Sequence, residues 1–154
     1  KMTKQVINYE KRTFYSETCF GDITDYWSLD FSVPGQYDVI YNHILTHKYY
    51  INMNKTEEIE LDKAILSWFK TVYIPVLHVI NKHHIMKYFV GRTKSDMYVY
   101  IIKYWDEIKQ KFGSTYTLDD IADSFTLKFG DSWIKKIKNK IKKLILKRKI
   151  EDNL

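Results

Sequence analysis

Apolar residues recur every three or four positions along most of this chain, the spacing that places them on one face of an α-helix. The pattern predicts helices over residues 36–50, 56–84, 93–112 and 117–129, and a last helix over 132–150. The apolar face of 56–84 is too wide for a surface helix, so this element and 93–112 are expected at the centre of the fold. The predicted fold class is therefore all-α, a single-domain bundle of five or six helices with a basic C-terminal helix.

Side chains at the predicted helix starts support these boundaries. Thr93 with Asp96, and Thr117 with Asp120, have the spacing of a capping box, in which each side chain bonds the backbone N–H of the other residue. Thr56 is the expected N-cap of the 56–84 helix. The residues expected to form the buried stripe of the 93–112 helix are Met97, Tyr98, Ile101, Ile102, Trp105, Ile108 and Phe112.

The helical pattern is interrupted in two places. Residues 1–33 follow neither a helical nor a strand period, and we expect an irregular N-terminal segment with a short helix around Asn8–Glu17 and then an extended stretch over the core. Pro75 lies inside the 56–84 helix and lacks the N–H that would bond the carbonyl four residues earlier. A kink or break is expected near Val72–Tyr73, because an interior proline costs about 3 kcal/mol.

Length and composition indicate one folded domain over residues 1–154. Apolar residues make up 45% of the chain and charged residues 29%, which is enough for a single core. The only cysteine, Cys19, has no partner for an internal disulfide, and no membrane span or signal peptide is apparent. These features predict a cytoplasmic protein without integral membrane association. A chain that begins at Lys1 rather than methionine is consistent with a fragment of a longer product.

The net charge of +6 resides entirely at the C-terminal end. Residues 1–130 contain 16 basic and 16 acidic side chains, whereas 131–154 contain nine basic and three acidic ones. A neutral body with a basic end is typical of a module that binds a polyanion. The side chains expected to contact phosphates are Lys135, Lys136, Lys138, Lys140, Lys142, Lys143, Lys147, Arg148 and Lys149.

Within 132–150 the apolar residues keep a helical spacing, so this segment is expected to dock one stripe on the body or on a second subunit. The stripe consists of Ile134, Ile137, Ile141, Leu144 and Ile145. Lysines four residues apart on the remaining face repel one another, and nearby phosphates would relieve that repulsion. The stretch Thr117–Lys149 also has the order of elements of a helix-turn-helix: a short capped helix, a turn and a basic helix. Its basic helix contains mostly lysine rather than arginine or asparagine, which favours phosphate contact over base recognition.

The leading prediction is a non-enzymatic nucleic-acid-binding module for DNA or RNA, with exposed tyrosines such as Tyr49, Tyr50 or Tyr100 available for stacking on single strands. The alternative is a protein-interaction or assembly module whose C-terminal helix pairs with a partner chain. That partner is either a different protein or a second copy of the same chain in a homo-oligomer. A third hypothesis is peripheral attachment to an anionic membrane, with Trp133 at the interface.

Other residues offer little for catalysis or metal binding. His43 and His47 are four apart on one helix, as two zinc ligands would be, and a histidine of the next helix would be the third ligand. Neither helix contains the H-E-x-x-H arrangement, so packing and surface roles are favoured. Carboxylates in adjacent positions do not share a helix face, and Cys19 has no apparent electropositive surroundings. We therefore predict no enzymatic activity, no metal and no cofactor.

Several stretches together resemble bacterial proteins that carry an N-terminal ParB-like domain and are often labelled transcriptional regulators. The similar stretches are F-x-x-x-T at Phe14–Thr18, VPGQYDVIYNHILTHKYYI at 33–51, SWFKTVYIPVLHVI at 67–80 and GRTKSDMYVYI at 91–101. The resemblance implies that this chain corresponds to the helical region after the ParB-like domain, which is itself absent. It also directs attention to His43, His47 and Arg92 as a possible polar or ligand-binding cluster.

Overall fold

The computed structural model describes residues 1–130, 139, 142 and 143, and every element within them is helical. The predicted all-α, single-domain class is confirmed. The elements are α1 (Met2–Thr18), α2 (Phe20–Ile23), α3 (Gln36–Asn52), α4 (Leu61–Trp68), the π-helical turn η1 (Phe69–Tyr73), α5 (Ile74–Lys82), the 3₁₀ turn η2 (Ile85–Tyr88), α6 (Lys94–Phe112), α7 (Leu118–Phe125) and the π-helical turn η3 (Thr126–Gly130).

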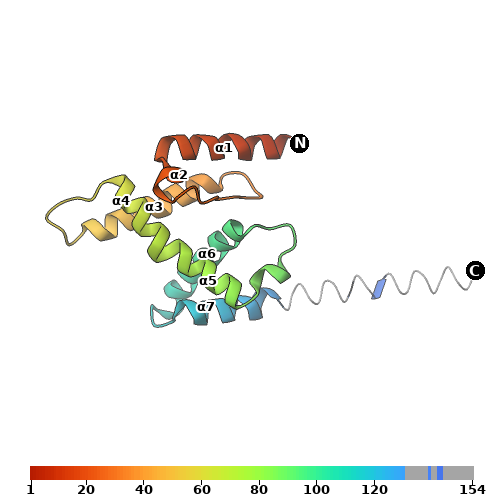
Figure 1. Cartoon of the computed structure of the whole chain (residues 1–154). Coiled ribbons are helices and arrows are strands. Elements are labelled where there is room, and N and C mark those ends of the chain that lie inside the picture. The colour runs from red at the N-terminus through yellow and green to blue at the C-terminus, as the bar shows by residue number, and fades with distance from the viewer. Residues whose placement is uncertain (131–138, 140–141, 144–154) are drawn as a thin grey trace, which may run out of the picture.

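The run α4–η1–α5 crosses the middle of the molecule and packs against α6, with α1 and α7 at opposite ends (Figure 1). Trp68 and Ile80 of the central run, and Met97 and Ile101 of α6, are fully buried. The predicted centre of the fold is therefore confirmed. Both elements have broad apolar faces, and burial of these faces is favourable, so the other helices pack around them.

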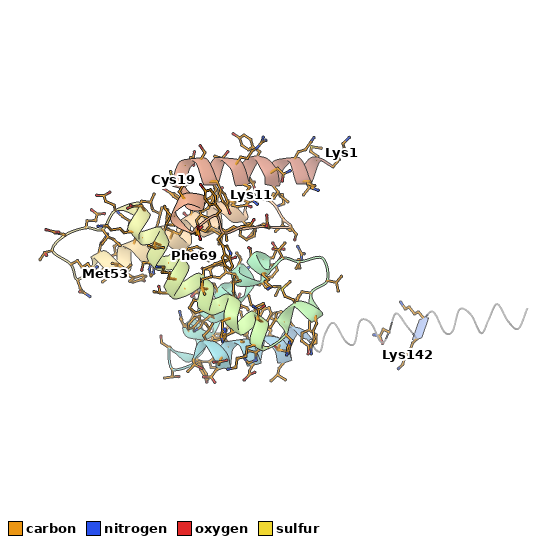
Figure 2. The ribbon with its side chains drawn as sticks, viewed as in Figure 1. Lys1, Lys11, Cys19, Met53, Phe69 and Lys142 are labelled. Carbon is orange, nitrogen blue, oxygen red and sulfur yellow. The ribbon has the colours of Figure 1, made fainter. Side chains whose placement is uncertain are left out.

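The N-terminal segment differs from the prediction. It is not irregular throughout, because α1 already begins at Met2 and continues to Thr18. Only Phe14 and Thr18 of this helix are buried, so few apolar positions mark its inner face and the period is faint in the sequence. The expected extended stretch does follow, with Leu29 and Phe31 buried in the core. In Figure 2, side chains between α1 and the central run, in the area of the labelled Lys11 and Phe69, lie close together.

The central run begins later than predicted and is not broken at Pro75. Thr56 is not its N-cap; α4 starts at Leu61 after the extended Glu60, because the loop before it is held by other contacts. In that loop the Ile59 N–H donates to Asn52 Oδ1 over 3.0 Å. Before Pro75 the helix widens into η1, so the disturbance expected near Val72–Tyr73 takes the form of a π-helical turn.

The N-termini of α6 and α7 match the sequence prediction. The Thr93 hydroxyl accepts from the Asp96 N–H, and the Asp96 carboxylate accepts from the Thr93 N–H. Thr117 and Asp120 form the same reciprocal pair. Gly113 ends α6 with φ of 84°, a left-handed value that favours glycine.

One described helical stretch, Leu61–Lys82, is long and apolar enough to cross a membrane by length and composition. Half of its most apolar window is buried inside the fold, and a single such stretch is weak evidence for a span, because the core helix of a soluble protein can have the same length and composition. The structure is compatible with a soluble protein.

Candidate functional site

The predicted basic helix over 132–150 lies largely outside the described residues. Of the nine basic side chains assigned to phosphate contact, the structure describes Lys142 and Lys143, which are helical and exposed. The predicted helix-turn-helix covers Thr117–Lys149: its first helix corresponds to α7, and its second lies largely outside the described residues.

His43 belongs to a buried hydrogen-bonded group that joins three helices. Its Nδ1 lies 3.0 Å from the hydroxyl of Tyr98 on α6, and that hydroxyl accepts from Trp68 Nε1 on α4 over 3.1 Å. Trp68 Nε1 can only donate to this hydroxyl, whereas the donor in the contact between the hydroxyl and His43 Nδ1 depends on the imidazole tautomer. Burial lowers the pKa of His43, opposed by the nearby carboxylate of Asp106. His43 thus fastens α3 to the core.

His47 and Arg92 have different partners from His43. His47 Nε2 lies 2.9 Å from the hydroxyl of Ser67 on α4, and burial lowers the His47 pKa. Arg92 Nη1 donates to Ser32 Oγ over 3.2 Å. The three residues of the possible polar cluster therefore serve three separate contacts. Among the described residues, no group of three or more histidine, cysteine or acidic side chains is placed to hold a metal ion.

The two histidines yield a pH prediction. Because burial lowers both pKa values below the ordinary 6.5, the unfolded chain binds protons more readily than the folded one. Their contribution to stability is present above about pH 6.5 and is lost as the pH falls through and below it. In an NMR titration, the ring protons of His43 and His47 should have lower midpoints in the folded protein than in the same chain unfolded in urea. Equal midpoints would contradict the burial that the structure shows.

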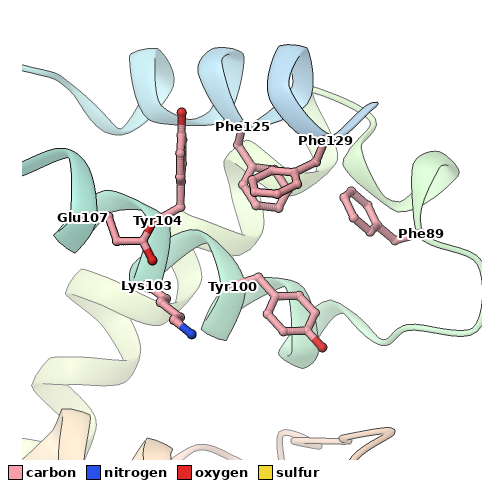
Figure 3. Close-up of a pocket in the computed structure, with 7 residues that line it drawn as sticks. All are labelled: Phe89, Tyr100, Lys103, Tyr104, Glu107, Phe125 and Phe129. Carbon is pink, nitrogen blue, oxygen red and sulfur yellow. The ribbon is translucent and has the colours of Figure 1, made fainter. Parts of the chain in front are cut away.

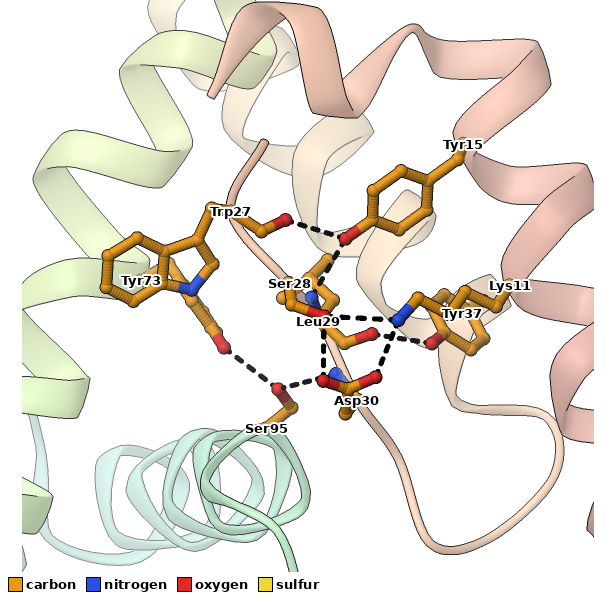
Figure 4. Close-up of polar contacts among 9 residues, drawn as sticks. All are labelled: Lys11, Tyr15, Trp27, Ser28, Leu29, Asp30, Tyr37, Tyr73 and Ser95. Atoms are coloured by element: carbon orange, nitrogen blue, oxygen red, sulfur yellow. Dashed lines mark hydrogen bonds and ion pairs between the residues drawn. The ribbon is translucent and has the colours of Figure 1, made fainter. Parts of the chain in front are cut away.

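The extended stretch after α2 is bound to the body through side-chain hydrogen bonds (Figure 4). The Tyr15 hydroxyl donates to the Trp27 carbonyl over 2.7 Å and accepts from the Leu29 N–H over 2.9 Å. The Tyr37 hydroxyl donates to the Leu29 carbonyl over 2.6 Å. The tyrosine hydroxyls bond backbone groups that would be paired within a strand or helix in regular structure. Part of the high aromatic content of the chain therefore has a structural role.

The hydroxyl of Ser95 links η1 and α6 to the same stretch. It lies 2.9 Å from the Tyr73 hydroxyl and accepts from the Asp30 N–H over 3.3 Å. Burial raises the pKa of Tyr73 to about 12. Each polar group in this network has a partner within the fold, so the network has the character of structural bonding rather than of a reactive centre.

Two hollows lie beside α6 and α7, together named the α6–α7 groove, and the sequence pattern does not predict them. A first hollow of about 270 Å³ lies at one end (Figure 3). Its lining residues are Phe89, Tyr100, Lys103, Tyr104, Glu107, Phe125 and Phe129. A second hollow of about 530 Å³ is lined by Ile108, Phe112, Tyr116, Asp120, Ile121, Asp123, Ser124 and Leu127. Tyr104 lines the first hollow and Ser124 the second, and their hydroxyls are hydrogen-bonded to each other, which joins α6 to α7.

Large apolar side chains stand exposed along this α6–α7 groove. Phe112 is 63% exposed and Leu127 is 70% exposed, and Tyr116 is also open to solvent. Phe112 was expected to complete the buried stripe of its helix, and that expectation was wrong because the chain turns away at Gly113 and no described element packs over it. The groove lacks converging catalytic groups and suits an apolar or amphipathic binding partner.

The tyrosines expected to stack on single strands lie in different surroundings. Tyr49 and Tyr50 at the end of α3 are about two-thirds exposed, at 64% and 65%, with ring centroids 5.6 Å apart. Tyr100 is half-buried, lines the first hollow and lies under the Arg92 guanidinium at 5.9 Å. Tyr49 and Tyr50 are thus the open pair.

Comparison of the chain with protein-family models, with curated proteins and with solved structures gave no match. The resemblance to proteins with a ParB-like domain stays a prediction from the sequence.

Proposed function

We propose that this protein is a non-enzymatic nucleic-acid-binding module that contacts phosphates through the basic residues of 132–150. The observation that carries the proposal is the separation of charge: the body is neutral, whereas 132–150 contains nine basic residues and no acidic one. Folded surfaces usually mix both signs, and a single-sign segment of this length attracts a polyanion strongly at low salt.

The mode of binding follows from the residue types. Eight of the nine basic side chains are lysines, which act as point charges toward phosphate rather than as bidentate readers of base edges. Binding should therefore depend weakly on nucleotide sequence and strongly on salt. If roughly four phosphates are engaged, the log–log salt slope should be about −3 to −4. The exposed Tyr49 and Tyr50 would favour single strands if bases reach α3.

Two variants of equal net charge test the location of binding. The first replaces Lys135, Lys136, Lys142 and Lys143 with glutamine, and the matched control replaces the exposed body lysines Lys4, Lys55, Lys63 and Lys70. Fluorescence anisotropy with labelled duplex DNA and single-stranded RNA is measured at two salt concentrations.

We expect the first variant to bind at least tenfold more weakly, and its salt slope to shrink by about 0.9 for each lysine that contacts a phosphate. The body variant should bind much as the original protein does. Equal weakening in both variants would show that only net charge matters, and the absence of binding by the unmodified protein at low salt would refute the function.

A further inference from the structure

A further hollow of about 520 Å³, which shares no lining residue with the α6–α7 groove, has basic residues around it. It lies between α5, η2 and the start of α6, and we name it the α5–η2 hollow. Its lining residues are Ile80, Asn81, His84, Met86, Lys87 and Lys94. Two are lysines, one is a histidine and none is acidic, whereas both hollows of the α6–α7 groove include a carboxylate. An anion in the α5–η2 hollow would therefore meet basic groups without an opposing carboxylate in the lining.

The sequence around the α5–η2 hollow has the same bias. Residues 63–95 contain six lysine or arginine residues, three histidines and no aspartate or glutamate. All of the lining residues belong to this acid-free segment. Because residues 1–130 contain equal numbers of basic and acidic side chains, their net charge conceals this local excess of basic groups.

The carboxylates that contact the residues just before His84 are engaged with those residues and do not line the hollow. Asp119 accepts from Lys82 Nζ over 2.9 Å and lies 3.0 Å from His83 Nε2. Asp123 Oδ1 lies 2.9 Å from His83 Nδ1. These contacts neutralise Lys82 and leave the basic groups of the hollow itself unpaired.

Lys87 and Lys94 make no ion pair with a carboxylate in the part of the chain that the structure describes. Lys87 Nζ lies 4.9 Å from the centroid of the Tyr88 ring, which attracts the ammonium group without neutralising it. The carboxylate of Asp96, two residues after Lys94, is 1% exposed and bound within the capping box of α6. Both ammonium groups therefore retain their charge for a ligand.

The backbone at His84 brings residues of α5 and η2 to one hollow. His84 has φ of 50° and ψ of 38°, a left-handed conformation that costs a residue with a Cβ about 1–2 kcal/mol. Its N–H donates to the Asn81 carbonyl over 3.1 Å, and its carbonyl accepts from the Lys87 N–H over 3.3 Å. The hollow is thus formed by the hydrogen-bonded backbone of the turn, before any ligand binds.

The rest of the lining suits a phosphate group. Ile80 is fully buried and Met86 is half-buried, and beside such apolar surface the attraction between charges is screened less than in open water. The Asn81 amide and the ring N–H of His84 add hydrogen-bond donors to the ammonium groups. A phosphate carries negative charge and at least three strong acceptor oxygens, so it matches several donors at once.

We propose that the α5–η2 hollow binds a phosphate group through the ammonium groups of Lys87 and Lys94. The side chains of Asn81 and His84 complete the site as hydrogen-bond donors. Two sources share this chemistry: a phosphodiester of a nucleic-acid backbone and a free phosphorylated small molecule. The first source rests on the proposed function, because one strand would then contact both the hollow and 132–150. The second source is independent of it.

A titration of the isotope-labelled full chain with inorganic phosphate tests the site. NMR follows the backbone amide signals at constant ionic strength, with chloride as the reference anion. We expect saturable shifts at His84, Lys87 and Lys94, and the same signals should not respond to chloride. Shifts that are absent at these residues, or that chloride reproduces, would overturn the proposal.

A hollow variant and a matched control locate the binding. The hollow variant carries Lys87→Gln and Lys94→Gln, and the control carries Lys63→Gln and Lys70→Gln, which lie exposed on α4 and η1 within the same acid-free segment. Because all four side chains are exposed, the fold should tolerate both variants, and circular dichroism checks this. We expect the affinity of the His84 signal for phosphate to fall about tenfold in the hollow variant, since two charged donors are lost. An equal fall in the control would mean that only net charge matters, against the proposal.

The source of the phosphate follows from anisotropy with a short labelled single-stranded DNA at several salt concentrations. If the ligand is a nucleic-acid backbone, the log–log salt slope should shrink by about 0.7 in the hollow variant, the value for one phosphate of a single strand, and stay unchanged in the control. An unchanged slope in the hollow variant, together with saturable binding of inorganic phosphate, would assign the hollow to a small phosphorylated molecule. Absence of DNA binding by the unmodified protein would refute the proposed function, whereas the phosphate titration decides the α5–η2 hollow separately.

Discussion

Replacement of Asp96 with alanine is expected to lower the free energy of unfolding by roughly 3–5 kcal/mol, because this carboxylate is both a helix cap and a buried acceptor. It is 1% exposed. It accepts from the Thr93 N–H over 2.9 Å, from the Ser32 N–H over 3.0 Å and from the Ser32 hydroxyl over 2.6 Å. Alanine would leave these donors without their acceptor in a part-buried site, and each buried donor that loses its acceptor costs about 1–3 kcal/mol.

Asp120 provides a matched control for this prediction. It occupies the equivalent capping-box position in α7 and accepts from the Thr117 N–H over 2.8 Å, but it is exposed. Asp120→Ala should therefore cost about 1 kcal/mol, the usual value of a solvated cap. Urea unfolding followed by circular dichroism measures both variants. Equal losses of stability for the two variants would show that the hydrogen bonds that Ser32 donates to Asp96 contribute little.

Trp68→Ala is expected to destabilise the protein by about 3–5 kcal/mol, through the cavity that it leaves in the centre of the fold. Trp68 is 1% exposed, and its ring lies 5.2 Å from that of Tyr73 and 5.6 Å from that of Tyr98. Removal of the indole also leaves the Tyr98 hydroxyl without its donor. The rings of this cluster come from α4, η1 and α6, so they cannot close the space without moving those elements.

Trp27→Ala tests whether the loss of stability depends on the burial of the tryptophan rather than on the residue type alone. Trp27 is 42% exposed and its ring touches Phe69 at a centroid distance of 5.5 Å. We expect Trp27→Ala to cost less than half as much as Trp68→Ala, because much of its surface is already solvated. Thermal unfolding monitored by circular dichroism compares the two. A similar loss at both positions would contradict the assignment of Trp68 to the core.

The accuracy of the sequence predictions depends on how local the determining interactions are. The starts of α6 and α7 were predicted correctly, because a capping box needs only residues three positions apart. The start of α4 was not, since Thr56 had the right chemistry for an N-cap but the loop is arranged by Asn52 and by the ion pair of Lys48 with Glu58. α1 was underestimated because only a few of its residues face the core.

The functional candidates divide in the same way. The single-sign charge of 132–150 is visible in the sequence itself, because counting charges requires no coordinates. For the histidine pair, the i, i+4 spacing suits either a metal site or helix packing, and the absence of an H-E-x-x-H arrangement favoured packing, but the spacing could not identify the partners. The partners of His43 and His47, on α6 and α4, come from residues 55 and 20 positions away.

The helical character of the chain, the starts of its capped helices and the location of its excess positive charge follow from the sequence alone, since each depends on neighbouring residues or on composition. The hydrogen bonds that Asp96 accepts from Ser32, 64 positions away, and the exposure of Phe112 beside the α6–α7 groove follow from tertiary packing. Such features depend on which helices come to lie side by side. A helical period states that a face is apolar, but the packing of distant elements determines whether that face is covered.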